Sequence, residues 1–474
     1  MPGAYAAEPA HDALARAFAS AAAIEDSYRR SKALADVAAA RVASGDIAGA
    51  RAACATARAA AERVPVPTLR HWALHDVVSC QIGGDELAAA AETIERIEDR
   101  SLRNAALAAL AKRQGDLLDY AAALATARRI AGAPAQGEAL REIAATRAEG
   151  GDLTGALDTA RGIADATWNA LALTDVAVAH VADRDVEEAR SLAARIRNGE
   201  LRARALGLIA VEQLRLGDPR GAAATLELVE GERERARTLA RMSKAAASSD
   251  DAADTSELLA RAVAGVRAVR AGAEWRSGAL YDIADAAFTA GDVALARESL
   301  REAFSAAMSV RQVPRRVGLL GAIARLQAKA GDVPGALQSV AAVEREDSSV
   351  LIVRDIAAAQ AEAGDGAGAL ATVSRLRDDQ VRVTALIGVA GAHARLGRAD
   401  AAREAISLAA PAVRGMTDAE FAAGALAALG RTMRAAGDAE AGERLLDEAM
   451  TRAAAASGEQ QVAAYVRVAE ALRD

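Results

Sequence analysis

The stretch QAKAGDVPGAL, from Gln327 to Leu337, decides the fold because it ends one helix and starts the next. An apolar run precedes Gly331, and glycine adopts the left-handed conformation that ends helices at little cost. Asp332 follows, and its side-chain oxygen can accept hydrogen bonds from the free N–H groups of a new helix. Pro334 falls in the first turn of that helix, where a missing N–H costs nothing. The stretch therefore predicts a helix–turn–helix hairpin.

The Gly-Asp pair recurs along the whole chain. Literal copies begin at Gly45, Gly84, Gly115, Gly151, Gly217, Gly291, Gly331, Gly364 and Gly437. Degenerate copies, Arg184-Asp185, Ser249-Asp250 and Gly397-Arg398, fill the gaps between them. A repeat of about 36 residues is typical of solenoids built from helical hairpins. The sequence predicts an α-solenoid of about 12 hairpins, or about 24 to 25 helices.

The composition of the 474-residue chain agrees with an all-α fold. Hydrophobic residues make up 52% of the sequence and aromatic residues only 3%, so most of the apolar volume is alanine, leucine, valine and isoleucine. Alanine is the best helix former, and β-strands favour aromatic residues, of which this chain has few. The net charge of −7 comes from nearly balanced acids and bases without a basic block, which argues against nucleic-acid binding. No stretch is apolar for long enough to predict a transmembrane helix.

Alignment on the turn residue gives columns with one residue type each. Large apolar residues stand eleven positions before the turn at Leu34, Leu140, Leu280, Leu320, Val353, Leu386 and Leu426. A second apolar residue and then a small one follow at eight and seven positions before it, and alanine recurs five positions after it. This order resembles the tetratricopeptide repeats over roughly residues 25–474. The resemblance implies a right-handed TPR-like solenoid whose first helices line a concave binding surface.

One column departs from the pattern of that family. Four residues before the turn, where the family commonly has a large apolar residue, this chain has the polar column Arg41, Arg147, His180, Gln213, Gln327, Gln360 and His393. These side chains can bond within and between hairpins, or they can line a groove for a partner's backbone. A second column, nine residues before the turn, holds Asp36, Glu142, Asp175, Asp282 and Asp355, which we expect to pair with nearby arginines.

The TPR-like resemblance also implies candidates for partner contact. If first helices line the concave face, these residues point inward: Arg141, Tyr281, Asp285, Phe288, Arg325, Arg354 and Arg431. Small residues such as Gly318, Gly321 and Gly391 lie among them and allow a partner helix or extended peptide to approach closely. The three tryptophans, Trp72, Trp168 and Trp275, are expected to pack in the core or between hairpins.

The two cysteines leave several interpretations open. Cys54 and Cys80 fall on neighbouring predicted helices, so they could form a disulfide in an exported protein or lie buried as thiols in a cytosolic one. A metal site of these cysteines with His71 and His75 is disfavoured, because the spacing of His75 and Cys80 does not suit one helix face. We therefore expect no metal and no cofactor.

The N-terminus is relevant to localisation. Ala4-Tyr5-Ala6, followed by Ala7-Glu8-Pro9, resembles the cleavage end of a secretory signal and favours export to the periplasm. Chance in an alanine-rich, cytoplasmic protein is the alternative. The predicted organisation is an N-terminal segment (residues 1–24), a first solenoid half (25–247) and a second half (248–474) that ends in a capping helix.

The sequence contains no phosphate-binding glycine loop, no nucleophile elbow and no cluster of catalytic histidines. We therefore expect a non-enzymatic scaffold that binds another protein or a peptide through its concave face. Two alternatives stay open: an all-helical enzyme whose hairpins close around a pocket, and a protein that assembles with copies of itself.

Overall fold

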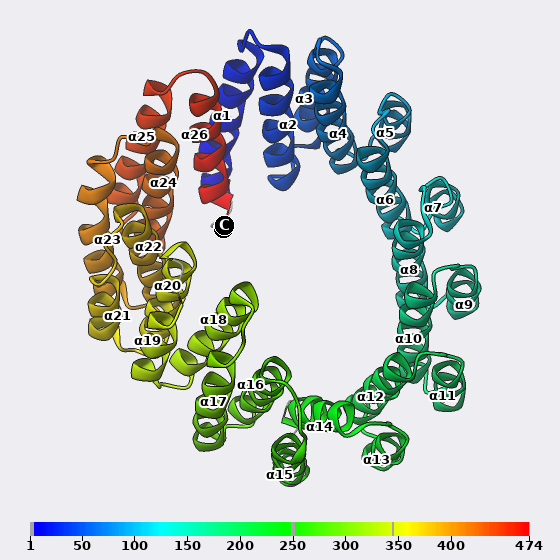
Figure 1. The fold of residues 1–474 in the computed structure, drawn as a ribbon. Coiled ribbons are helices and arrows are strands. Elements are labelled where there is room, and N and C mark those ends of the chain that lie inside the picture. The colour runs from blue at the N-terminus through cyan, green and yellow to red at the C-terminus, as the bar shows by residue number, and fades with distance from the viewer. Residues whose placement is uncertain (1–3, 248–251, 344–345, 474) are drawn as a thin grey trace. The chain divides into compact units, whose positions relative to one another are not determined.

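The structure is a computed structural model that describes residues 4–247, 252–343 and 346–473, and side chains for 9–247, 256–343 and 352–473. The described residues form 26 α-helices and no β-strand (Figure 1). The all-α prediction is therefore confirmed. Consecutive helices pack against each other as antiparallel hairpins, as the repeated turns predict.

The even-numbered helices are the first helices of the hairpins, and they are uniform in length at 16 or 17 residues. They are α2 (Ser27–Ala43), α4 (Pro67–Gly83), α6 (Arg100–Asp116), α8 (Ala133–Glu149), α10 (Ala166–Ala182), α12 (Gly199–Arg215), α14 (Glu232–Ala247), α16 (Ala273–Thr289), α18 (Val313–Lys329), α20 (Glu346–Glu362), α22 (Asp379–Arg395), α24 (Ala419–Ala435) and α26 (Gly458–Arg473).

The odd-numbered helices from α3 onward are the second helices, and they occur in two lengths. The short ones, of 8 or 9 residues, are α5 (Leu87–Ile94), α7 (Tyr120–Ala127), α9 (Leu153–Arg161), α11 (Val186–Ala194), α13 (Pro219–Glu227), α19 (Val333–Ala341) and α21 (Gly366–Val373). The long ones, of 15 to 17 residues, are α3 (Ile47–Ala61), α15 (Ala252–Ala268), α17 (Val293–Met308), α23 (Ala399–Arg414) and α25 (Ala439–Ala455). The remaining helix, α1, spans Ala4–Ala22.

The turns have the geometry that the Gly-Asp pair predicts. At the turn between α18 and α19, Gly331 has a φ of +74°, and the Asp332 N–H donates to the carbonyl of Gln327 at 2.8 Å. This bond back to the third-last helical residue is the Schellman motif that ends helices. The Asp332 carboxylate then accepts from the Gly335 N–H at 3.1 Å and caps the next helix. Eight further aspartates cap second helices in this way.

Two turns lie at other residues than the sequence predicts. The helix α6 continues through Gly115, and the left-handed residue is Leu118 with a φ of +64°. The Asp119 carboxylate provides the cap there by accepting a hydrogen bond from the Ala122 N–H at 3.1 Å. Leu118 adopts the left-handed conformation, which is sterically unfavourable for a residue other than glycine. At the preceding turn the left-handed residue is Asp85 rather than Gly84. The degenerate pair Ser249-Asp250 lies outside the described residues.

With these corrections the repeat is regular. The left-handed residues Asp85, Leu118, Gly151, Arg184 and Gly217 follow one another at intervals of 33 residues, all around short second helices. Larger intervals occur where the second helix is long, because about two additional turns of helix are inserted there. Six of the seven residues predicted eleven positions before the turn are at most 7% exposed, and Val353 is 8% exposed.

The described chain divides into two compact units. Unit 1 contains Met1–Gly132 and Gly364–Asp474, and unit 2 contains Ala133–Ala363. In unit 2 the first helices pack side by side from α8 to α20, and the second helices lie along one side of them (Figure 1). The boundary expected at residue 248 falls on residues outside the described part, so the two sequence halves stay a prediction.

Unit 1 joins the two ends of the chain. The helix α1 packs lengthwise on α26 and also contacts α2, with Ala13, Leu14, Ala17 and Ala21 buried (Figure 1). The Ser20 hydroxyl donates to Gln461 Oε1 at 2.7 Å across this contact. The helix α1 therefore packs on α26 in the way that a second helix packs on the first helix of its hairpin. Side chains of residues 1–8 lie outside the described part, so the signal-like Ala4-Tyr5-Ala6 is not tested.

Candidate functional site

The sequence-predicted contact residues of unit 2 lie mainly on one surface, which we call the first-helix face. It is the side of α14, α16, α18 and α20 that turns away from the second helices. Tyr281 and Asp285 are one turn apart on α16, while Arg325 lies on α18 and Arg354 on α20. The opposite side of α16 carries the buried Leu280, Ile283 and Ala287, so the helix period separates core from face.

Ion pairs between neighbouring helices order this face. Lys244 on α14 pairs with Asp285, and Asp355 on α20 accepts from Arg354 at 2.8 Å and lies 3.5 Å from Arg325 Nη1. Such half-exposed pairs contribute at most about 1 kcal/mol each to stability. Their main effect is to fix the positions of side chains that remain open to solvent.

A more buried charge group lies at one end of the face. Glu234 on α14 is within 3.6 Å of Arg241 Nη1 and 3.8 Å of Arg237 Nη1, and its side chain is 13% exposed. Burial raises the pKa of Asp282 on α16, and Arg241 and Arg237 oppose that shift. Burial also raises the pKa of Tyr281, so its phenol stays protonated and can serve as a hydrogen-bond donor.

The remaining predicted contact residues lie elsewhere. Arg141 on α8 donates to Asp175 on α10 at 2.8 Å, in the same unit but farther along the helix layer. Phe288 is half-buried two turns after Tyr281 on α16. Arg431 belongs to α24 of unit 1, and its Nε is buried without a partner. The structure thus brings together Tyr281, Asp285, Arg325 and Arg354, but not all seven.

The polar column points into the hairpins. Arg147 donates to Asp152 at 2.8 Å, whereas Gln213 and Gln327 accept from Thr225 at 2.6 Å and from Ser339 at 2.7 Å. Arg41 donates to the Gly49 carbonyl at 2.8 Å. Each of these bonds joins the end of a first helix to its own second helix. The corrected turns add Gln81 and Gln114 to the column, and Gln114 accepts from Thr126 at 2.8 Å.

The other members of the polar column are also enclosed. His180 Nδ1 lies 3.5 Å from the Asp185 carboxylate, and Gln360 is 4% exposed. His393 is 3% exposed, its Nδ1 has no hydrogen-bond partner, and burial lowers its pKa with a further contribution from Arg398. These positions leave little surface for a partner, so the column holds hairpins together.

Sequence reasoning missed a cleft in unit 1, which we call the seam cleft. It has a volume of about 600 Å³ and lies between α2, α24 and α26. Its lining includes Lys32, Asp36, Glu420, Val466 and Arg467. A second cleft of about 290 Å³ lies on the other side of α2, against α4. No local pattern predicts the seam cleft, because it depends on the packing of the N-terminal helices against α26.

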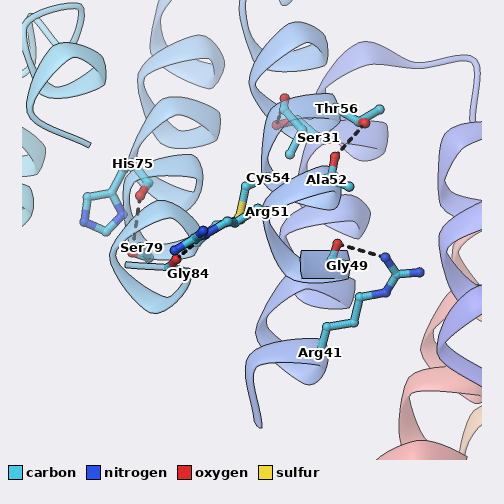
Figure 2. The surroundings of a disulfide bond; sticks show 12 residues. Ser31, Arg41, Gly49, Arg51, Ala52, Cys54, Thr56, His75, Ser79 and Gly84 are labelled. Carbon is cyan, nitrogen blue, oxygen red and sulfur yellow. Dashed lines mark hydrogen bonds between the residues drawn. A yellow bond between two sulfur atoms is a disulfide. The ribbon is translucent and has the colours of Figure 1, made fainter. Parts of the chain in front are cut away.

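Cys54 on α3 and Cys80 on α4 form a disulfide between two neighbouring hairpins (Figure 2). The two sulfurs lie in a buried cluster with Ala35, Ala38 and Ala53. Arg51 Nε donates to the Gly84 carbonyl at 2.8 Å and joins the same two hairpins.

The histidines near the disulfide do not converge on a metal position. His75 stacks edge-on to Trp72, and His71 Nε2 lies 3.9 Å from Glu98. Across the side chains that the structure describes, no three histidine, cysteine or acidic residues are arranged to hold a metal ion. Within the described chain, no helix combines the length and apolar character needed to cross a membrane.

No protein-family model and no curated protein sequence matches the chain. Among solved structures, yeast Tom70 is 14% identical, with 93% of this chain and 95% of that one covered at a TM-score of 0.30. The Cut9–Hcn1 hetero-tetramer of the APC/C is 11% identical, with 89% and 90% covered and a TM-score of 0.22. A circular tandem repeat protein is 15% identical, with 90% and 83% covered and a TM-score of 0.15.

Similarity at these TM-scores supports no inference about what this chain binds. The helices and turns define the fold by themselves: the described chain is an alanine-rich array of helix–turn–helix hairpins whose turns and columns resemble those of the tetratricopeptide repeats.

Proposed function

We propose that the protein is a non-enzymatic scaffold that binds a protein or peptide on the first-helix face. The observation that carries the proposal is the open space above two glycines of that face. Gly278 in α16 and Gly318 in α18 have no atom within 4 Å of the position that a Cβ would take. Glycine in a helix interior costs about 1 kcal/mol relative to alanine, and nothing in the described packing requires these two.

The open glycines lie where the backbone of a ligand could approach the helices closely. Gly278 lies one turn before Tyr281, and Gly318 lies two turns before Arg325, so each shares a helix side with an exposed or half-exposed polar group. Such glycines allow close backbone approach, while the phenol and guanidinium can bond a partner's carbonyls or carboxylates. The ion pairs around them hold these groups in position.

The acidic and basic groups of the face favour binding over catalysis. Asp285 and Asp355 are paired with cations, and histidine is absent from the described part of this face. A catalytic acid or base needs access to a substrate atom within hydrogen-bond reach. Among the described carboxylates of this face, Asp282 has a raised pKa, and it lies beside Arg241.

The test uses a phage-displayed library of random twelve-residue peptides selected on the full chain. Affinities of the selected peptides are then measured by fluorescence polarisation for wild type, Gly318→Arg and the control Gly199→Arg. Gly199 is an exposed residue at the start of α12, away from the face. We expect Gly318→Arg to weaken binding by at least tenfold and Gly199→Arg to leave it unchanged. Equal affinities for all three proteins, or no selected peptide, would refute the proposal.

We further propose that the protein is exported to an oxidising compartment such as the periplasm. The Cys54–Cys80 disulfide supports this, because such bonds persist outside the reducing cytosol. Alkylation of free thiols in freshly lysed producing cells tests it. We expect both cysteines to be protected until reductant is added, and immediate alkylation of both contradicts export.

A further inference from the structure

The seam cleft has an apolar floor and charged edges. Small and branched residues of α2 and α26, namely Ala39, Ala43, Ala463 and Val466, line it. Arg29 Nε lies 3.3 Å from Glu459 at one end of the cleft. A floor of this kind can accept the aliphatic part of a side chain while its edges remain hydrated.

Two cations that line the seam cleft, Arg29 and Arg467, form ion pairs with carboxylates of the protein. Arg467 on α26 lies 3.1 Å from Glu420 and 3.0 Å from Glu470. Asp36 on α2 differs, because its carboxylate has neither a hydrogen bond nor an ion pair with any side chain that the structure describes. Lys32 is the nearest cation in sequence, one turn earlier on the same helix.

Asp36 lies where two clefts meet. It lines the seam cleft on the α26 side and the smaller cleft on the α4 side, together with Lys32 and Ala39. Although Asp36 is solvent-exposed, the helices on both sides remove part of its hydration, and this burial raises the pKa of its carboxyl. Lys32 opposes the shift, whereas Asp76 on α4 and Glu470 on α26 add to it. Carboxylates therefore approach Asp36 from both flanking helices, and a ligand cation would be favoured there.

We propose that the seam cleft binds a polypeptide segment by seating one arginine or lysine side chain on Asp36, with apolar neighbours of that side chain on the alanine and valine floor. This site deepens the proposed scaffold function and lies in unit 1, separate from the first-helix face.

Two observations select this occupant. Among the described side chains, no three histidine, cysteine or acidic residues are arranged to hold a metal ion, which disfavours a bare divalent ion at Asp36. The clefts continue on both sides of Asp36, so there is room for residues before and after the basic one. A charge-assisted hydrogen bond in a partly desolvated cleft supplies specificity for the cation.

The probe is a fluorescein-labelled seven-residue peptide of alanine and valine with one central arginine, and its counterpart has norleucine at the centre. Binding is measured by fluorescence polarisation to the full chain at low and high salt. We expect the arginine peptide to bind at least tenfold more tightly than the norleucine peptide. Asp36→Asn should abolish that difference, and the control Asp400→Asn, at a 99% exposed side chain on α23, should preserve it.

A second variant guards against a folding defect in Asp36→Asn. Ala39 is exposed and lines both clefts, so Ala39→Arg should fill the site with a competing guanidinium and lower arginine-peptide binding by at least tenfold. Melting curves of both variants report whether they fold. Unchanged peptide binding in two folded variants would overturn the proposal, and so would equal binding of the arginine and norleucine peptides.

Free spermidine and free arginine serve as competitors that identify the source of the cation. We expect each competitor to displace half of the bound arginine peptide only when the competitor concentration is at least tenfold above the dissociation constant of the peptide. Half-displacement by spermidine at a concentration near the dissociation constant of the peptide would identify a small amine as the ligand of the site. That result would overturn the proposal. Library peptides that depend on Gly318 but not on Asp36 would leave the scaffold function intact while the seam-cleft site fails.

Discussion

Gly318→Ala is expected to stabilise the protein, although it alters the proposed binding face. Gly318 lies in the interior of the 17-residue helix α18, and nothing lies within 4 Å of the new methyl position. The change therefore creates no clash and little burial, so helix propensity and the smaller entropy of the unfolded chain determine the result. Both favour alanine, by about 0.5–1 kcal/mol in total.

The matched control is Gly430→Ala in α24. A Cβ at Gly430 would lie 2.8 Å from the Gly442 carbonyl oxygen and 3.0 Å from Leu446 Cγ. The carbonyl belongs to the backbone of α25, so the two helices must separate to admit the methyl group. We expect this overpacking to cost about 1–3 kcal/mol, which exceeds the gain in helix propensity.

Thermal unfolding followed by circular dichroism measures both effects. For a cooperative unit the size of unit 2, 1 kcal/mol corresponds to a shift in Tm of about 2–4 °C. We expect Gly318→Ala to raise the Tm and Gly430→Ala to lower it. A lower Tm for Gly318→Ala would show that the glycine has a structural role, and the open-face argument for partner binding would then fail.

Three further predictions concern unit 1. Leu14→Ala on α1, at a side chain 1% exposed, should cost about 2–5 kcal/mol and speed amide exchange in α26; unchanged exchange there would contradict the pairing of the two helices. In the unfolded state His393 binds a proton near the usual pKa of 6.5, whereas burial lowers its pKa in the folded state. The folded protein should therefore have its full stability above that pH and lose stability as the pH drops below it. His393→Gln should reduce this fall in denaturation midpoints between pH 7.5 and 5.5, and an equal fall in both proteins counts against the argument. Reduction of the Cys54–Cys80 disulfide, which closes a loop of 26 residues, should cost about 3 kcal/mol by the loop-entropy model, with no effect of reductant on a Cys54→Ala/Cys80→Ala protein.

Local chemistry made the hairpins predictable from the sequence. A left-handed residue followed by a capping aspartate is a short signal, and most copies were located correctly from it. The turn after α6 was placed wrongly because Gly115-Asp116 has the expected letters, whereas Asp119 makes the cap. The columns could have resolved this, since Leu107, Leu110 and Gln114 fall into register only when Leu118 is the turn residue.

The candidate sites were less predictable because they depend on pairings between distant helices. Helical spacing alone places Tyr281 and Asp285 on one side of α16, and the expected pairing of the aspartate column with arginines is seen for Asp175 and Asp355. The partner of Asp285, however, is Lys244 on another helix, and sequence spacing does not reveal it. The seam cleft needs the contact of α2 with α26, for which the sequence carries no local signal.

The pairing of α1 with α26 has a consequence for synthesis of the chain. Ser20 and Gln461 are 441 residues apart, so at about 5–20 residues per second the ribosome makes α1 roughly 20–90 s before its partner. During that interval the apolar side of α1 lacks the surface that covers it in the finished protein. The helix α1 then has only its contact with α2, so nascent chains arrested before α26 should be more sensitive to protease within α1 than the full chain.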